Sequence, residues 1–145
     1  MIVDSLNLFA ENASTGNVGT NILGNVMDIG TSRDIGTGQP LYVNAQVTTG
    51  ITAGSAGTYV IKLTSASDAA LSSGAVDHVV SASVATSTTA IAAGTVLLNA
   101  ALPAGTYGRY IGIREVVGTA NTTAGKVSAF LSNDQISWTA YAGAK

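Results

Sequence analysis

The sequence predicts an all-β protein, most simply a jelly-roll-like antiparallel β-sandwich of about eight strands, with an immunoglobulin-like sandwich as the second architecture. Several segments alternate apolar and polar residues with the two-residue period of half-buried strands. Turns rich in Gly, Ser and Thr separate these segments, and the best helix candidate, residues 67–72, would form only one or two turns. The 145 residues are enough for one domain with one core.

The clearest strand pattern lies in residues 41–48, where Leu41, Val43, Ala45 and Val47 share one face. Residues 58–64 and 126–132 show the same alternation. Residues 107–117 carry charged side chains on both faces, so we expect this strand to be partly covered on both sides. The remaining strands are expected at about residues 25–30, 76–84, 95–99 and 135–141.

The first 35 residues alternate less clearly and are rich in Asn and Gly. Such a segment has too few regularly spaced apolar residues to predict a core strand. We therefore expect residues 1–35 to form an extended N-terminal arm that leads into a sandwich domain of residues 36–145.

A short motif, Ala-Gly followed by Thr or Lys, recurs at positions 56, 93, 104 and 124. Glycine supplies the positive φ that a tight turn needs, so each copy predicts a chain reversal before a strand. The last copy lies in the stretch GTANTTAGKV, residues 118–127, which superficially resembles a phosphate-binding loop. Six residues instead of four separate its glycines, and Val127 stands where such a loop needs Ser or Thr. We interpret residues 118–127 as a hairpin turn.

The composition argues against several classes of function. Charged residues make up 10% of the chain and the net charge is -2, so no basic patch is present to bind nucleic acid. The chain has no cysteine and its acids are scattered, which predicts no metal site and no cofactor. No segment approaches the roughly 18 apolar residues of a membrane span, and the N-terminus lacks a signal-peptide pattern, so we expect synthesis in the cytoplasm and no membrane partner.

Catalytic motifs are also missing from the sequence. The one histidine, His78, follows Asp77, but no serine stands in a Gly-x-Ser-x-Gly elbow. We therefore predict no catalytic residue and no enzyme. Trp138 and Tyr141 could stack on a sugar, which keeps a lectin-like or adhesin β-sandwich as the alternative function, although large aromatics in such a domain more often anchor the core.

Two long segments, residues 35–61 and 78–108, contain no Asp, Glu, Lys or Arg. Both must include turns and outward strand faces, which free monomers usually keep charged because uncharged β-edges pair with one another. This surface is therefore expected to be covered by a partner. Base rates for symmetric assemblies favour self-association as a dimer, with a trimer as the alternative.

One stretch, GNVMDIGTSRDIGTGQPLYV at residues 24–43, resembles the capsid cement (decoration) proteins of tailed double-stranded-DNA bacteriophages. RYIGI at 109–113 and GKVSAFL at 125–131 also fit, and the resemblance extends over about residues 22–134. It implies a jelly-roll subunit on the outer surface of the virion, bound to the major capsid protein and often self-associated at a symmetry axis. It implies no catalytic, cofactor-binding or metal-binding residue.

The same resemblance suggests that Asp28, Arg33 and Asp34 belong to the arm that contacts the capsid or a neighbouring subunit. Taken by themselves, these three residues are spaced closely enough for a local ion pair or a turn contact. A calcium site is less favoured, because no further oxygen ligands lie nearby in the sequence.

Overall fold

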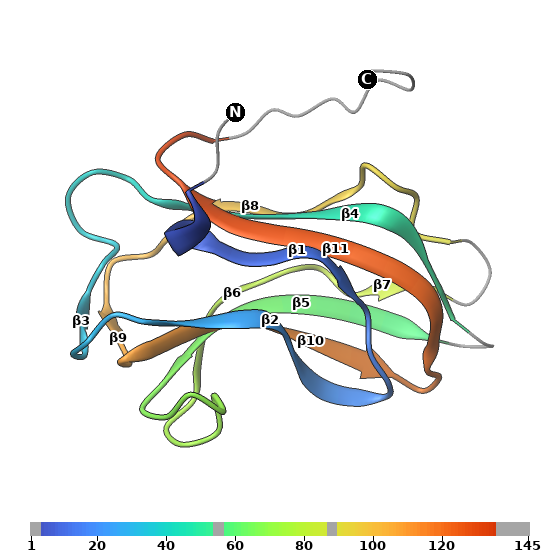
Figure 1. Ribbon diagram of the computed structural model, residues 1–145, viewed down its shortest axis with the longest axis horizontal. Coiled ribbons are helices and arrows are strands. Elements are labelled where there is room, and N and C mark those ends of the chain that lie inside the picture. Colours follow the sequence, from blue (N-terminus) through green and yellow to red (C-terminus); the bar gives the residue numbers. More distant parts are fainter. Residues whose placement is uncertain (1–3, 54–56, 87–89, 136–145) are drawn as a thin grey trace.

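The computed structural model describes residues 4–53, 57–86 and 90–135, which form two antiparallel sheets packed face to face (Figure 1). Sheet A contains, in spatial order, β1 (Leu8–Ser14), β11 (Thr122–Ser132), β4 (Tyr42–Ala53) and β8 (Val96–Ala101). Sheet B contains β2 (Gly19–Asp28), β10 (Tyr110–Gly118), β5 (Thr58–Ala66) and β6 (Val76–Val80). The described residues also form the two-residue strands β3 (Arg33–Asp34), β7 (Val84–Ala85) and β9 (Thr106–Tyr107). A 3-10 turn, η1 (Ser5–Asn7), precedes β1.

The strand order of the eight longer strands is that of a jelly roll. Counted along the chain, sheet A holds the first, eighth, third and sixth of them, and sheet B holds the second, seventh, fourth and fifth. Only the β5–β6 connection joins two neighbours of one sheet, while every other connection between these eight strands changes sheet. The predicted fold class, a jelly-roll-like antiparallel sandwich of about eight strands, is confirmed.

The core lies between the sheets and follows the predicted alternation. Val43, Ala45 and Val47 of β4 are buried, as are the inward residues of β5 and β11. Strand β10 is partly covered on both sides, as expected: its inward side chains are fully buried, and Arg114 and Val116 on its outward side are half-buried. The described residues contain no helix long and apolar enough to cross a membrane.

The prediction of a separate N-terminal arm is wrong for most of its residues. Strand β1 pairs with β11, and β2 pairs with β10, so these residues form one edge of each sheet. Their alternation is weak because the pairing of β1 is interrupted by register shifts and because Asn12 and Gly24 adopt positive φ values of 50° and 81°. An edge strand with such bulges does not keep a strict two-residue period.

The interpretation of residues 118–127 as a hairpin is also wrong. Strands β10 and β11 belong to different sheets, so the connection between them crosses the sandwich. The turn role of the repeated glycines is confirmed at Gly94, which has a φ value of 86°. Gly125, with a φ value of 148°, lies inside β11 instead, where the register between β11 and β4 shifts. The strand predicted at 135–141 lies outside the described residues except for Gln135, which is not in a strand.

Candidate functional site

Asp28, Arg33 and Asp34 lie at one end of the sandwich, where β3 pairs with β9 (Figure 1). We call this region, residues 28–37 and 103–110, the β3–β9 end. Arg33 is paired in register with Tyr107, and Asp34 with Thr106. The structure therefore brings the three candidate residues together with a segment that follows them by about 70 positions in the sequence.

Asp28, the last residue of β2, forms an ion pair with Arg109 instead of Arg33. The guanidinium donates from Nε to Oδ1 over 2.9 Å and from Nη2 to Oδ2 over 2.7 Å, a two-point contact that fixes the direction of both side chains. The hydrogen bonds from Arg109 and from the Gly30 amide lower the pKa of Asp28 to about 2. Asp28 is thus ionised at all physiological pH values, but its charge is already neutralised by Arg109.

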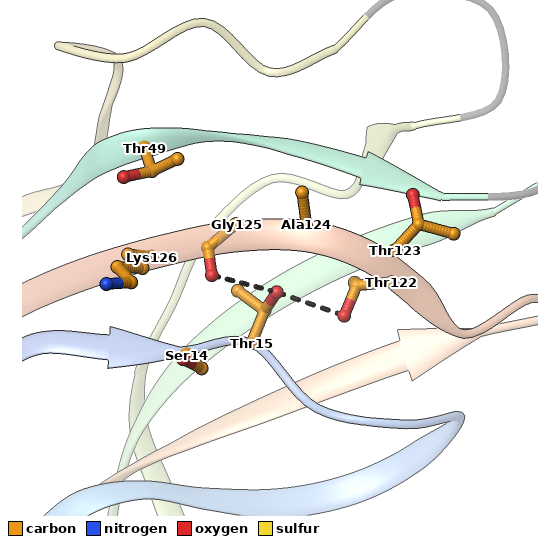
Figure 2. A pocket seen from close by; sticks show the side chains of 8 residues that line it. All are labelled: Ser14, Thr15, Thr49, Thr122, Thr123, Ala124, Gly125 and Lys126. Carbon is orange, nitrogen blue, oxygen red and sulfur yellow. Dashed lines mark hydrogen bonds between the residues drawn. The ribbon is translucent and has the colours of Figure 1, made fainter.

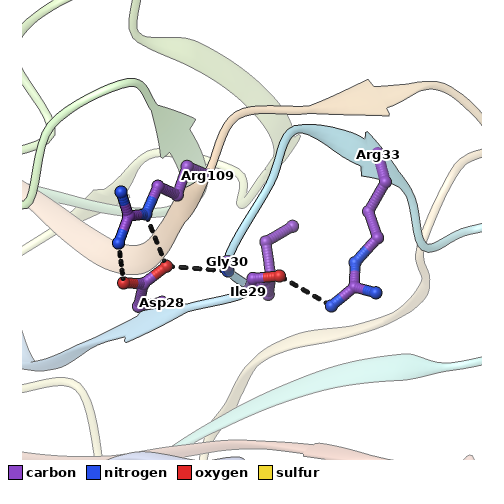
Figure 3. Close-up of polar contacts among 5 residues, drawn as sticks. All are labelled: Asp28, Ile29, Gly30, Arg33 and Arg109. Atoms are coloured by element: carbon purple, nitrogen blue, oxygen red, sulfur yellow. Dashed lines mark hydrogen bonds and ion pairs between the residues drawn. The ribbon is translucent and has the colours of Figure 1, made fainter.

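Arg33 presents a charge that no neighbour neutralises. Its Nη2 donates to the Ile29 carbonyl oxygen over 2.6 Å, and it has no carboxylate partner among the described residues. Figure 3 shows Arg33 and Arg109 on opposite sides of the turn at Ile29 and Gly30. Because Arg33 is exposed, its remaining donors face solvent and are available to an acidic group of a partner.

Asp34 makes a turn contact. Its carboxylate accepts from the amides of Gly36 and Thr37 and from the Thr37 hydroxyl, and these bonds lower its pKa. The turn packs against the β8–β9 connection so closely that a Cβ on Gly36 would overlap the carbonyl oxygen of Pro103. The β3–β9 end is therefore a fixed shape, held by backbone contacts on both sides.

Tyr107 and His78 anchor this end to sheet B. The rings stack with centroids 3.8 Å apart, and the Tyr107 hydroxyl donates to the Pro103 carbonyl over 2.7 Å. Burial, together with the negative charge of Asp34, raises the pKa of Tyr107 to about 12, so the hydroxyl keeps its proton. Burial lowers the pKa of His78, which favours the neutral ring although the charge of Asp77 opposes this.

His78 also lies close to a serine, a contact that the sequence pattern does not reveal. The Ser65 Oγ is 2.7 Å from His78 Nε2, and it accepts a hydrogen bond from the Gly108 amide over 2.9 Å. Such a pair resembles a nucleophile and its base. Ser65 is only 1% exposed, however, so its hydroxyl has no access to a substrate, and the contact fastens β5 to the segment before β10.

Sequence reasoning also missed a buried carboxyl in the core. Glu115 is 1% exposed; its Oε2 accepts from the Tyr59 hydroxyl over 2.9 Å and its Oε1 from the Gly16 amide over 2.7 Å. Burial raises the pKa of Glu115, while the bonds from Tyr59, Gly16 and Asn21 oppose the rise. The sequence did contain a sign of this burial: in residues 107–117, Glu115 occupies an alternating position shared with Ile111 and Ile113, which point into the core.

A shallow pocket of about 290 Å³ opens on sheet A, away from the β3–β9 end (Figure 2). Its walls are formed mainly by side chains that carry hydroxyl groups. The Thr15 hydroxyl donates hydrogen bonds to the Thr122 hydroxyl and to the Gly125 carbonyl oxygen. None of the lining residues is aromatic, so the pocket offers no ring on which a sugar could stack. Trp138 and Tyr141, on which the carbohydrate alternative rests, lie outside the described residues. No group of three or more potential metal ligands occurs in the described part of the chain.

The fold and the β3–β9 end together define a jelly-roll protein with a rigid, charged loop surface at one end of its sandwich. The chain belongs to the Bbp16 family, whose model matches residues 12–131. The matched range begins within β1 and ends within β11, so it covers nearly all of the two sheets. A search of curated proteins finds no match.

Proposed function

We propose that this protein is a structural virion protein, a cement subunit that binds the outer surface of an assembled phage capsid through the major capsid protein. The observation that carries the proposal is the motif at residues 24–43, because its resemblance to cement proteins coincides with the rigid β3–β9 end. The jelly-roll topology supports it, since this is the fold that the resemblance implies. Arg33 supplies an unneutralised charge for the contact.

Self-association is the second part of the proposal. The two uncharged segments meet in sheet A, where β4 pairs with β8. Strand β8 is the edge of that sheet, and its sequence VLLNAA has neither the charge nor the proline that usually prevents edge strands from pairing. A second copy of this chain can therefore pair along β8 without bringing like charges together. Such pairing gives a dimer with two-fold symmetry, the commonest closed symmetry.

Light scattering at micromolar concentration tests this contact. We expect the wild-type protein to be a dimer and Val96→Lys to be a monomer, because the substitution places a charge on β8 at a side chain that is 43% exposed. Val18→Lys is the matched control, since Val18 is 49% exposed and precedes β2 at the opposite edge. If Val18→Lys and Val96→Lys dissociate equally, or if the wild type is a monomer, the β8 contact is rejected.

The cement function is tested with heads assembled without this protein. A dimer that touches several capsid subunits gains affinity through effective concentration. It should therefore sediment with assembled heads and bind the free major capsid protein more weakly. A ligand that binds only the assembled state stabilises that state, by about 2.7 kcal/mol per site when its concentration is a hundred times Kd. Decorated heads should therefore release their DNA at a higher temperature.

Arg33→Glu links that experiment to the β3–β9 end. Reversal of this exposed charge should weaken binding to heads by about tenfold, the effect of a typical interface residue of moderate importance. Lys126→Glu makes the same change of charge in β11 of sheet A and should bind as the wild type does. Absence of co-sedimentation, or decoration that leaves the temperature of DNA release unchanged, would refute the cement function.

A further inference from the structure

The outer face of sheet B carries an uncovered patch centred on Arg114. Cross-strand register places Ile22, Arg114, Lys62 and Val80 in one row across the four strands, and Val116 and Val60 in the next row. Residues directly opposite in an antiparallel sheet point to the same face, so these six side chains share the outer surface. We call them the Arg114 patch.

The chain covers the neighbouring part of this face but leaves the patch open. The connection from β5 to β6 runs beneath sheet B (Figure 1), and its Leu71 is fully buried. A Cβ on Gly112 would meet Leu71 Cδ1 at 2.8 Å, so Leu71 packs on the sheet at that point. In the row of Arg114, by contrast, Ile22 and Val80 are 38% and 52% exposed. Two large aliphatic side chains therefore stand at the ends of the row, with Arg114 and Lys62 between them.

The charges of the patch do not cancel. Lys62 Nζ forms an ion pair with Asp77 at 2.7 Å. Burial raises the pKa of Asp77, but the bonds from Lys62 and Thr64 and the charge of Arg114 outweigh it and lower the pKa overall. Arg114 is half-buried, and its side chain has no hydrogen bond or ion pair among the described residues. The patch therefore keeps a net positive charge, because the two cations Lys62 and Arg114 lie near the single carboxylate of Asp77.

We propose that the Arg114 patch docks on the capsid surface, against an acidic side chain that is surrounded by aliphatic ones. Interfaces favour arginine at their centre with apolar neighbours that exclude water, which is the composition of this patch. A second copy of this chain does not fit, because a two-fold contact would place Arg114 and Lys62 against the same cations. The proposal rests on the cement function and names the sheet face and the partner chemistry that the function requires.

Binding of variants to heads assembled without this protein tests the patch. Arg114→Glu should weaken binding by about thirtyfold or more. The new carboxylate would repel the acidic side chain of the capsid and leave that side chain without a partner in the interface. Arg114→Gln, which keeps a long polar side chain, should lose about tenfold. Val80→Asp tests the apolar rim separately at a more exposed position and should also weaken binding by about tenfold.

Four controls keep these results specific. Each variant is first melted by circular dichroism, and if an Arg114 variant is less folded than the wild type at the assay temperature, the test relies on Val80→Asp instead. Lys126→Glu repeats the charge reversal on sheet A, and sedimentation at about 50 and about 300 mM salt measures long-range attraction, which salt screens. Binding of a soluble peptide with one Asp among Leu and Val residues is expected to be undetectable, since the patch needs the assembled surface.

The outcomes separate the patch from the cement function. The patch proposal is supported if the wild type and Lys126→Glu bind the heads while the Arg114 and Val80 variants bind them more weakly. Equal binding by the wild type and Arg114→Glu overturns the patch and leaves the cement function standing. Equal loss in Arg114→Glu and Lys126→Glu also overturns the patch, because general attraction then explains the binding. Failure of the wild type to bind rejects the cement function and the patch with it.

Discussion

Gly108→Ala is expected to lower the free energy of unfolding by about 3 kcal/mol, the upper end of the range for an overpacked interior. A Cβ at Gly108 would overlap the backbone oxygen, carbon and nitrogen of Ala66. Backbone atoms of β5 cannot move aside as a flexible side chain can, and the Gly108 amide must also stay within reach of the Ser65 hydroxyl. Urea unfolding followed by circular dichroism measures the change.

Gly50→Ala is the control for Gly108→Ala. A Cβ at Gly50, in β4, would meet only the Ile91 carbonyl oxygen, at the ordinary contact distance of 3.4 Å. The free energy of unfolding should therefore change little, and alanine even restricts the unfolded chain. Equal stability of Gly108→Ala and the wild type would show that β5 and the segment before β10 can separate without loss.

Tyr59→Phe should lower the free energy of unfolding by about 1–3 kcal/mol at neutral pH, because it removes a donor from a buried carboxylate. The Tyr59 hydroxyl donates to Glu115 Oε2 in the core, and burial is the main reason why the pKa of Tyr59 is raised. The loss should shrink as the pH falls toward about 4.5, since the protonated carboxyl depends less on this donor. Urea unfolding across pH 4 to 8 measures both effects.

The direction of this pH dependence follows from the raised pKa of Glu115. Below its unfolded value of 4.5 the carboxyl is protonated in both states, and its contribution to stability is fully present. As the pH rises through the folded pKa, the folded state gives up a proton that the unfolded state has already lost, so stability decreases. The bond from Tyr59 limits that decrease, which is why Tyr59→Phe costs more at higher pH.

Glu115→Gln distinguishes this cause from other titrations. In the Glu115→Gln background, Tyr59→Phe should have the same effect at every pH, because position 115 no longer ionises. Effects of His78, whose pKa is lowered by burial, cancel when variants with and without Tyr59→Phe are compared at the same pH. A pH-dependent cost of Tyr59→Phe that persists in the Glu115→Gln background would contradict the assignment, as would a cost that grows in acid.

The fold class was predictable because a strand with one buried face must place an apolar residue at every second position, and this pattern is visible in the sequence. Val43, Ala45 and Val47 on one face of β4, and Tyr59, Ile61 and Leu63 on one face of β5, have to point into the same core. The edges were harder, because β1 and β2 each have one neighbouring strand and contain positive-φ residues, so their apolar residues follow no fixed period. Local sequence does not reveal that a distant strand supplies their hydrogen bonds.

The candidate site shows the same division between local and distant contacts. The turn made by Asp34 with Gly36 and Thr37 is local, and a turn contact was one of the alternatives that the spacing favoured. The partner of Asp28 is Arg109, 81 positions away, and no spacing rule connects them. In the sequence, Glu115 was recognisable only as a charged residue among the apolar residues of one strand face. Its contact with Tyr59 is set by the register between β5 and β10, which the sequence does not show.

The pairing of β1 with β11 constrains the order in which the chain can fold. The first long strand forms its sheet hydrogen bonds with the last, and the Asn12 amide donates to the Ser128 hydroxyl across 116 positions. During synthesis, at about 5–20 residues per second, β1 must therefore wait for almost the whole chain before it has a partner. Contacts between such distant segments also make folding intrinsically slow. Sheet A can therefore be completed only after residues 122–132 have been synthesised, when its first and last described strands meet.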